Sequence, residues 1–249
     1  NLSAAGELLA AHARRTRLDS ERVLSEIHGL MQLRSGAVKI ATSEGFAIDL
    51  MPAAIAEFRR TYAGIRFDLA SISPADVTRR VADGDADIGM TFSLAPIKGV
   101  RIERSWPAPI LALMRADHPL AGRRSLRLAE IATYAVAIPR PDTTIRQLLD
   151  ICLASQAIPI EPVLTSNHMG ALRNFSRYGG GISLTSALSV ALRHHEEGMV
   201  LVPIEDPGMH VRRMELQTMA ERTLPQAARA FLDHLGGMIG ALLERAPKT

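Results

Sequence analysis

Along the chain from residue 36 onward, short runs of β-branched and other apolar residues alternate with longer stretches whose apolar residues recur at helical spacing. Runs of the first kind predict strands, and stretches of the second kind predict helices. Strands separated by helices are joined by right-handed crossovers and pair in a mainly parallel sheet. The alternation comes in two series, and 249 residues with 47% hydrophobic content suffice for two cores. The sequence therefore predicts an α/β fold with two units.

The predicted elements of the first series are strands at 37–42, 66–71 and 86–91 and helices at 48–62 and 74–83. Those of the second series are strands near 109–115, 133–139, 161–165, 181–185 and 200–204 and helices near 125–131, 143–155, 168–178 and 186–196. A strand at 211–219 and a last helix at 225–243 follow and are placed to return to the first unit. Proline and glycine clusters at 107–109 and 203–208 mark the expected crossover points.

Residues 5–33 precede both series and are predicted to form one long helix, because they contain no proline and are rich in Ala, Leu, Glu and Arg. The first half of this helix is polar almost all round, which is typical of a connector or of a helix paired with a partner. Its second half carries apolar residues at Val23, Leu24, Ile27, Leu30 and Met31. These residues fit partner contact and packing against their own chain equally well.

The first strand ends in hydroxyl side chains at the start of a predicted helix, within the segment Gly36–Ser43. The free N–H groups and the positive dipole end of a helix N-terminus favour a negative charge, and Thr and Ser add donors. A small carboxylate is the natural ligand for such a junction. The alternative for Ser43 is that its side chain only caps the helix.

The sequence lacks a recognisable catalytic or metal-binding constellation, so we expect neither an enzyme nor a cofactor. His194 and His195 are adjacent, and on a helix they point about 100° apart, which prevents them from chelating one ion. The acidic segment 83–87 has no downstream bidentate Glu and is expected to be a turn, not a calcium loop. Cys152, the one cysteine, excludes an internal disulfide and is expected to be a buried structural thiol.

Charge and hydropathy also limit the possible partners. The net charge is +3, without a dense basic stripe and interleaved aromatic residues, so this chain itself is a poor candidate for nucleic-acid contact. It contains neither a membrane-spanning apolar run nor a charged-then-apolar leader, so we expect a cytoplasmic protein without membrane contact. The chain begins at Asn1, which suggests a fragment of a longer protein.

Six motifs occur along the chain in this order: Leu2–Gly6 with Leu8, Leu9 and Ala13; Gly36–Ser43; Leu50–Pro52 with Phe58 and Tyr62; Asp83–Gly89; Ala116–Ala121; and Gly179–Ile182. Taken together, they make the chain resemble LysR-type transcriptional regulators over essentially its whole length. The first motif is similar to the signature in which the winged helix-turn-helix leads into the linker helix. Most of the DNA-binding domain is therefore expected to be missing.

The resemblance implies a periplasmic-binding-protein-like fold, with two Rossmann-like subdomains joined by two crossover strands and preceded by a long linker helix. The expected parts are the end of the DNA-binding wing with the linker and dimerisation helix (1–35), subdomain I (36–109 and 209–249) and subdomain II (110–208). The family also implies homodimers that assemble into homotetramers, and promoter DNA bound through the missing domain.

The resemblance places a small-molecule inducer in the cleft between the subdomains. The effector-binding residues that it implies are Thr42, Ser43, Glu44, Ser71, Ser73 and Phe92 from subdomain I, and Arg140, Thr143, Thr144, Asn167 and His168 from subdomain II. Glu44 adds a negative charge beside the expected anion site, so the inducer is either partly apolar or carries an amine. Arg140 either contacts the ligand or pairs with Asp142.

The leading hypothesis is thus the effector-binding and oligomerisation part of a transcriptional regulator. A solute-binding protein of a transport system shares the fold, but the long polar N-terminal helix and the absence of a leader disfavour it. A hydrolase or transferase ranks last, because no nucleophile has a neighbouring base.

Overall fold

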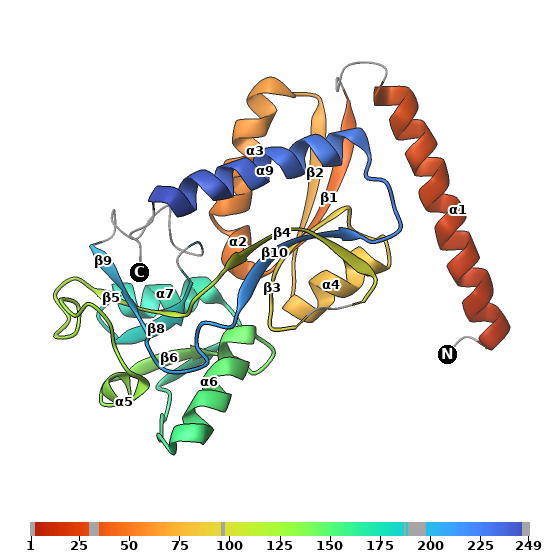
Figure 1. Cartoon of the computed structure of the whole chain (residues 1–249). Coiled ribbons are helices and arrows are strands. Elements are labelled where there is room, and N and C mark those ends of the chain that lie inside the picture. The colour runs from red at the N-terminus through yellow and green to blue at the C-terminus, as the bar shows by residue number, and fades with distance from the viewer. Residues whose placement is uncertain (1–2, 30–34, 96–97, 187, 189–197, 246–249) are drawn as a thin grey trace.

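The computed structural model describes residues 3–29, 35–95, 98–186, 188 and 198–245, and Figure 1 shows the strands of this part of the chain in two separate sheets. The first sheet has the strand order β2-β1-β3-β10-β4. Its strands are β1 (Gly36–Thr42), β2 (Ile65–Ser71), β3 (Ile88–Ser93), β4 (Val100–Pro107) and β10 (Arg213–Met219). We call this sheet with its helices the first lobe.

Helices cover both faces of the first sheet and enclose its strand β1. They are α3 (Leu50–Thr61) and α9 (Gln226–Arg245) on one face and α4 (Pro74–Ala82) on the other. Val38 and Ile40 of β1 belong to the same buried cluster as Phe231 of α9. Ala41 packs instead with Val77 of α4. Because side chains alternate across a strand, one short apolar run supplies both layers of the core.

The second lobe is built around a sheet with the strand order β7-β6-β8-β5-β9. Its elements are β5 (Leu111–Arg115), α5 (Leu128–Ile131), β6 (Val136–Pro139), α6 (Thr144–Gln156), β7 (Leu164–Ser166), α7 (Met169–Arg177), β8 (Ile182–Thr185) and β9 (Met199–Pro203). Cys152 lies in the core of this lobe, and its thiol donates to the Pro207 carbonyl oxygen at 3.3 Å. Burial and the nearby Asp206 carboxylate raise the pKa of this thiol, so the prediction of a structural cysteine is confirmed.

The chain crosses between the lobes twice, once after β4 and once between β9 and β10, as the proline clusters predict. The two crossing segments are bonded to each other, because the Ala108 N–H donates to the Arg212 carbonyl oxygen at 3.0 Å. The predicted C-terminal return to the first unit is confirmed. The sheets are mixed, however: β10 runs antiparallel to β3 and β4, and β5 runs antiparallel to β8 and β9.

Some predicted elements differ from the structure or lie outside its described part. The helix expected at 48–62 is α3, which begins after Asp49, a residue whose φ of −122° departs from helical geometry. The sequence did not predict β4 or the short helix α2 (Glu44–Ala47) that precedes α3. The predicted helix at 186–196, including His194 and His195, lies almost entirely outside the described residues.

Helix α1 (Ala4–Gly29) stands beside the first lobe and lies next to one end of α9 (Figure 1). Leu8 is 71% exposed and Val23 is 49% exposed, so apolar side chains on this helix face solvent. The side chains of Leu24 and Ile27, and the whole residues Leu30 and Met31, lie outside the described part of the chain. Among the described helices, none has the length and hydrophobicity required to cross a membrane.

Candidate functional site

A cavity of about 490 Å³ lies between the two lobes and takes its wall from both. This volume lies within the range of small-molecule sites. Its lining residues are Ser43, Glu44, Gly45, Ala47, Ile48, Ser71, Ile72, Ser73, Pro74, Phe92 and Arg212 from the first lobe and the crossover, and Asp142, Thr143, Thr144, Ile145, Asn167, His168 and Met169 from the second lobe. Nine of the eleven predicted effector-binding residues are in this wall.

Ser43 lies at the carboxyl end of β1, where β1 meets β3. Its N–H donates to the Met90 carbonyl oxygen at 3.0 Å, and its hydroxyl is 2.9 Å from the Thr91 hydroxyl. It precedes α2, but its side chain makes no capping hydrogen bond to that helix. The alternative that Ser43 only caps a helix is therefore wrong. When Thr91 supplies the proton of their shared bond, the Ser43 hydroxyl keeps its own proton for a ligand.

Ser73 and Thr143 line the cavity and also cap helices. The Ser73 hydroxyl accepts from the Asp76 N–H at 3.3 Å at the start of α4. The Thr143 hydroxyl accepts from the Arg146 N–H at 3.3 Å at the start of α6, and it donates to the Arg140 carbonyl oxygen at 3.0 Å. Both side chains hold the ends of helices that face the cavity, so their role in the fold is established by the geometry.

Glu44 and His168 connect the lobes at the cavity wall. The His168 Nδ1 atom is 3.3 Å from a Glu44 carboxylate oxygen. The carboxylate of Glu44, which the sequence suggested for a ligand amine, therefore already has a partner from the opposite lobe. Asp142, a second acidic residue in the wall, was named from the sequence only as a possible partner of Arg140.

Two predicted residues lie away from the cavity wall. Thr42 is fully buried, and its hydroxyl donates to the Met90 carbonyl oxygen at 3.0 Å, inside the first sheet. Thr42 is the last residue of β1 and Ser43 follows it with an extended backbone, so their side chains point in opposite directions. Arg140 is exposed at the end of β6, beyond the residues that enclose the cavity.

Arg212 is a cavity residue that the sequence analysis did not predict. Its side chain is 0% exposed, and its guanidinium carbon lies 3.6 Å from the centre of the Phe92 ring. In the described part of the chain, none of its three guanidinium nitrogens has a hydrogen-bond partner. Burial lowers the pKa of Arg212 to about 9, so the group is still positively charged at neutral pH. In the local sequence Arg212 stands next to a second arginine, Arg213, and nothing there signals this burial.

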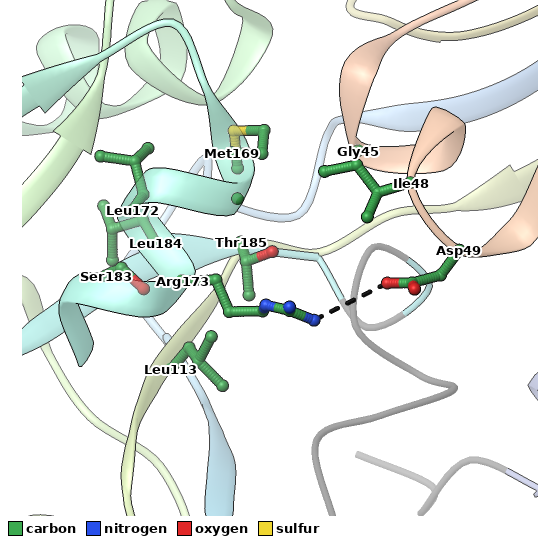
Figure 2. Close-up of a pocket in the computed structure, with 11 residues that line it drawn as sticks. Gly45, Ile48, Asp49, Leu113, Met169, Leu172, Arg173, Ser183, Leu184 and Thr185 are labelled. Carbon is green, nitrogen blue, oxygen red and sulfur yellow. Dashed lines mark ion pairs between the residues drawn. The ribbon is translucent and has the colours of Figure 1, made fainter. Parts of the chain in front are cut away.

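A narrow crevice beside the cavity forms a second contact between the lobes, shown in Figure 2. The loop after α2 meets α7 there, and the Arg173 guanidinium lies 3.7 Å from the Asp49 carboxylate. The free space is about 10 Å³, which is barely enough for one water molecule. This crevice is therefore an interlobe contact, and the larger cavity is the candidate ligand site.

The described residues do not include a group of three or more His, Cys, Asp or Glu side chains that could hold a metal ion. The acidic segment 83–87 forms the predicted turn, with Gly84 at a φ of +74°. Asp87 contributes to the fold, since its carboxylate accepts from the Lys39 N–H at 2.9 Å and pairs with Arg222 at 3.1 Å.

The sequence and the fold of the chain are similar to those of known proteins. A family model described as LysR substrate binding domain matches residues 31–239. The SDS degradation transcriptional activation protein of a Pseudomonas species is 30% identical, over 100% of this chain and 80% of that protein. The regulatory domain of Synechocystis PCC6803 CcmR in complex with 2-PG gives a TM-score of 0.67 at 19% identity, over 82% of this chain and 97% of that chain. The effector binding domain of QuiR in complex with shikimate gives a TM-score of 0.62 at 16% identity, over 81% and 95%.

Proposed function

The chain belongs to the LysR substrate-binding domain family, and from this premise we propose that it binds a small organic anion between its lobes and thereby controls a DNA-bound regulator. It is the effector-binding part of a LysR-type transcriptional regulator, with the predicted periplasmic-binding-protein-like fold. The observation that carries the proposal is the cavity of about 490 Å³ with walls from both lobes. A ligand there contacts both lobes at once and favours the arrangement to which it binds more tightly.

The chemistry of the wall supports an anion as the ligand. Ser43 presents a hydroxyl that does not cap a helix, and Arg212 supplies a positive charge. Two proteins of the same fold hold shikimate, which is a carboxylate, and 2-PG. We therefore assign effector binding to the cavity-lining members of the predicted set, with Ser43 as the first residue to test. Thr42 and Arg140 are left out because they lie off the wall.

The proposal extends to the organisation of the chain. Residues 1–35 act as the linker and dimerisation segment, residues 36–109 and 209–249 form subdomain I, and residues 110–208 form subdomain II. The exposed Leu8 and Val23 of α1 support pairing of this helix with a second copy, in a homodimer or homotetramer. Promoter DNA is contacted by the regulator's DNA-binding domain, so the proposal also includes a cytoplasmic location.

The matched relative favours gene regulation over catalysis, because it is a transcriptional activation protein. No similarity reported above favours the transport alternative. We therefore propose a sensor that binds its ligand without converting it. Closing and opening of the lobes would then change how the assembled copies present their DNA-binding domains.

The test is a thermal-shift screen with three pairs of compounds: shikimate and methyl shikimate, benzoate and benzamide, and succinate and succinamide. A ligand at a hundred times its dissociation constant stabilises a protein by about 2.7 kcal/mol, which gives a visible shift. We expect at least one carboxylate to raise the melting temperature of the wild-type chain. In Ser43→Ala this shift should be reduced, while the melting temperature without ligand changes little.

Ser155→Ala is the matched control, because the Ser155 hydroxyl donates to the Cys152 carbonyl oxygen within α6, away from the cavity wall. This variant should respond to ligand as the wild type does. An unchanged response of Ser43→Ala would remove Ser43 from the site. A flat response of the cooperatively melting wild type to every compound would contradict the proposed function.

A further inference from the structure

The charge of Arg212 is unbalanced within the described structure. The side chain is completely buried, and none of its guanidinium nitrogens has a hydrogen-bond partner there. The guanidinium makes a cation–π contact with the Phe92 ring, and its carbon atom lies 3.6 Å from the centre of that ring. A cation–π contact compensates only part of the free energy of removing a charge from water. A buried cation without a partner is stabilised when an anion binds beside it.

The carboxylates near Arg212 in sequence and along the cavity are engaged elsewhere or exposed. Glu215 of β10 accepts from the Ser93 hydroxyl at 2.5 Å and from the Gln217 side-chain amide at 2.9 Å. Glu44 in the cavity wall faces His168 at 3.3 Å. Asp142 is exposed on the second lobe. Burial lowers the pKa of Arg212, and among the described residues no acidic neighbour opposes this effect.

We propose that Arg212 is the counter-charge for the ligand's carboxylate, which makes it the residue that selects organic acids over neutral compounds. This inference rests on the proposed function and specifies the position of the anion. Ser43 is the anion site expected from the sequence. In this inference Arg212 holds the charge, and Ser43 contributes a hydroxyl to the same cavity wall.

The planar guanidinium suits a carboxylate in particular. The Phe92 ring stacks with the guanidinium, at 3.6 Å from its carbon atom, and the N–H groups of a guanidinium lie along the edge of its plane. An arginine edge matches the two oxygens of a carboxylate, whereas a lysine ammonium is a point charge that neither stacks nor forks. Arg212→Lys should therefore restore carboxylate binding poorly, although it keeps the positive charge.

The location of Arg212 couples this charge to the movement of the lobes. Its carbonyl oxygen accepts from the Ala108 N–H at 3.0 Å, which joins the two crossing segments. Arg212 belongs to the cavity wall, but its guanidinium nitrogens have no contact with solvent in this arrangement. The carboxylate thus reaches Arg212 when this part of the wall loosens, so that ion pairing and rearrangement of the crossing segments are one event.

The experiment compares the wild type with Arg212→Met by thermal shift and isothermal titration, using the same carboxylate and neutral pairs. We expect carboxylates to bind roughly 10- to 100-fold more weakly to Arg212→Met, as for loss of a charged hydrogen-bond partner. Without ligand, this variant should melt at or above the wild-type temperature, because methionine replaces an unpaired buried charge. Arg140→Met is the control: it removes the same charge from an exposed position off the wall and should bind carboxylates as the wild type does.

The outcomes separate this inference from the proposed function. Carboxylate shifts that are equal in the wild type and Arg212→Met would overturn the role of Arg212 and leave ligand sensing intact. Shifts produced only by the neutral members of the pairs would overturn the role of Arg212 and also the organic anion named in the proposed function. A ligand-free Arg212→Met that melts well below the wild type would show that the guanidinium is satisfied inside the fold, which also overturns the inference. If no compound shifts the wild type, both proposals fail.

Discussion

At the scale of single residues, the polar side chains of the cavity wall differ in whether the fold already uses them. Ser73 and Thr143 accept hydrogen bonds from helix N–H groups, so alanine at either position weakens a helix as well as any ligand contact. In the described structure, the side chains of Ser43 and Arg212 make no hydrogen bond to a helix end. Substitutions at these two positions therefore report most directly on binding.

His118 provides a pH-dependent prediction, because its imidazole accepts a backbone hydrogen bond in the second lobe. The Leu120 N–H donates to His118 Nδ1 at 3.2 Å. Burial lowers the pKa of His118 below its usual 6.5, although the Asp117 charge acts in the opposite direction. The unfolded chain therefore takes up the proton at higher pH than the folded protein does. His118 contributes stability above about pH 6.5, and this contribution is lost as the pH falls through the lower folded value.

We expect the free energy of unfolding of the wild type to fall by about 1 kcal/mol relative to His118→Asn between about pH 7.5 and pH 5. Asparagine is the matched variant, since its side-chain oxygen can accept from an N–H two residues on without titrating. Urea unfolding at several pH values measures the difference. Parallel pH profiles of the two proteins would show that the His118 hydrogen bond has no pH-dependent role.

Some residues of the cavity wall could be predicted from the sequence, and others could not. The lining residues at strand ends, such as Ser43 and Ser71, were predictable because open α/β sheets bind ligands at the carboxyl edges of their strands. Arg212 was not, because it stands in a charged Arg-Arg pair and its contact in the fold is Phe92, more than a hundred residues earlier. Thr42, which was also predicted for the site, is not in the cavity wall, because its hydroxyl donates to the Met90 carbonyl oxygen inside the first sheet.

At the scale of elements, the junction of α7 and β8 depends on a glycine that no other residue can replace. Gly181 has a φ of +134°, and a Cβ atom there would lie 2.1 Å from the Ala135 carbonyl oxygen. The same oxygen accepts from the Ile182 N–H at 2.9 Å, which begins the pairing of β8 with β6. A side chain at Gly181 would therefore push apart two neighbouring strands of the second sheet.

We expect Gly181→Ala to lower the free energy of unfolding by roughly 2–4 kcal/mol, from backbone strain together with the clash. Gly122→Ala is the control, because nothing lies within 4 Å of a Cβ atom at that turn. It should change stability by less than about 0.5 kcal/mol. Chemical denaturation of both variants measures the difference, and equal values for the two would contradict the close strand approach.

Strand β4 could not be predicted because its sequence lacks the apolar run that is typical of a strand. Its central residues Arg101, Glu103 and Arg104 are charged, and the strand lies at the edge of the first sheet. An edge strand with polar side chains lacks the apolar run by which β1 and β3 are predictable. Its one carboxylate is used in a tertiary contact: Glu103 pairs with Arg229 of α9 at 3.0 Å. This segment is extended because it pairs with β10 in the folded protein.

At the scale of the whole molecule, a Glu–His contact and an Arg–Asp ion pair join the lobes beside the cavity in the described part of the chain. Glu44 and His168 are 24% and 73% exposed, so water screens their attraction and little stabilisation is expected. Asp49 and Arg173 are 6% and 15% exposed and lie in the crevice of Figure 2. The second pair should therefore contribute more to the closed arrangement. Arg146 and Asp150 form a suitable reference pair, because both belong to α6 and cannot affect the contact between lobes.

We expect a double-mutant cycle of Asp49→Asn and Arg173→Met to give a coupling free energy of about 1–3 kcal/mol. The corresponding cycle for Arg146 and Asp150 should give about 0.3–0.5 kcal/mol, as for an exposed helix pair. Because only the first pair joins the lobes, only its variants should increase the radius of gyration measured by X-ray scattering without ligand. A radius unchanged in both sets, with equal coupling energies, would mean that the crossing segments alone fix the lobe arrangement. The ligand would then have to act by bending those segments at Arg212, and not by competing with an interlobe ion pair.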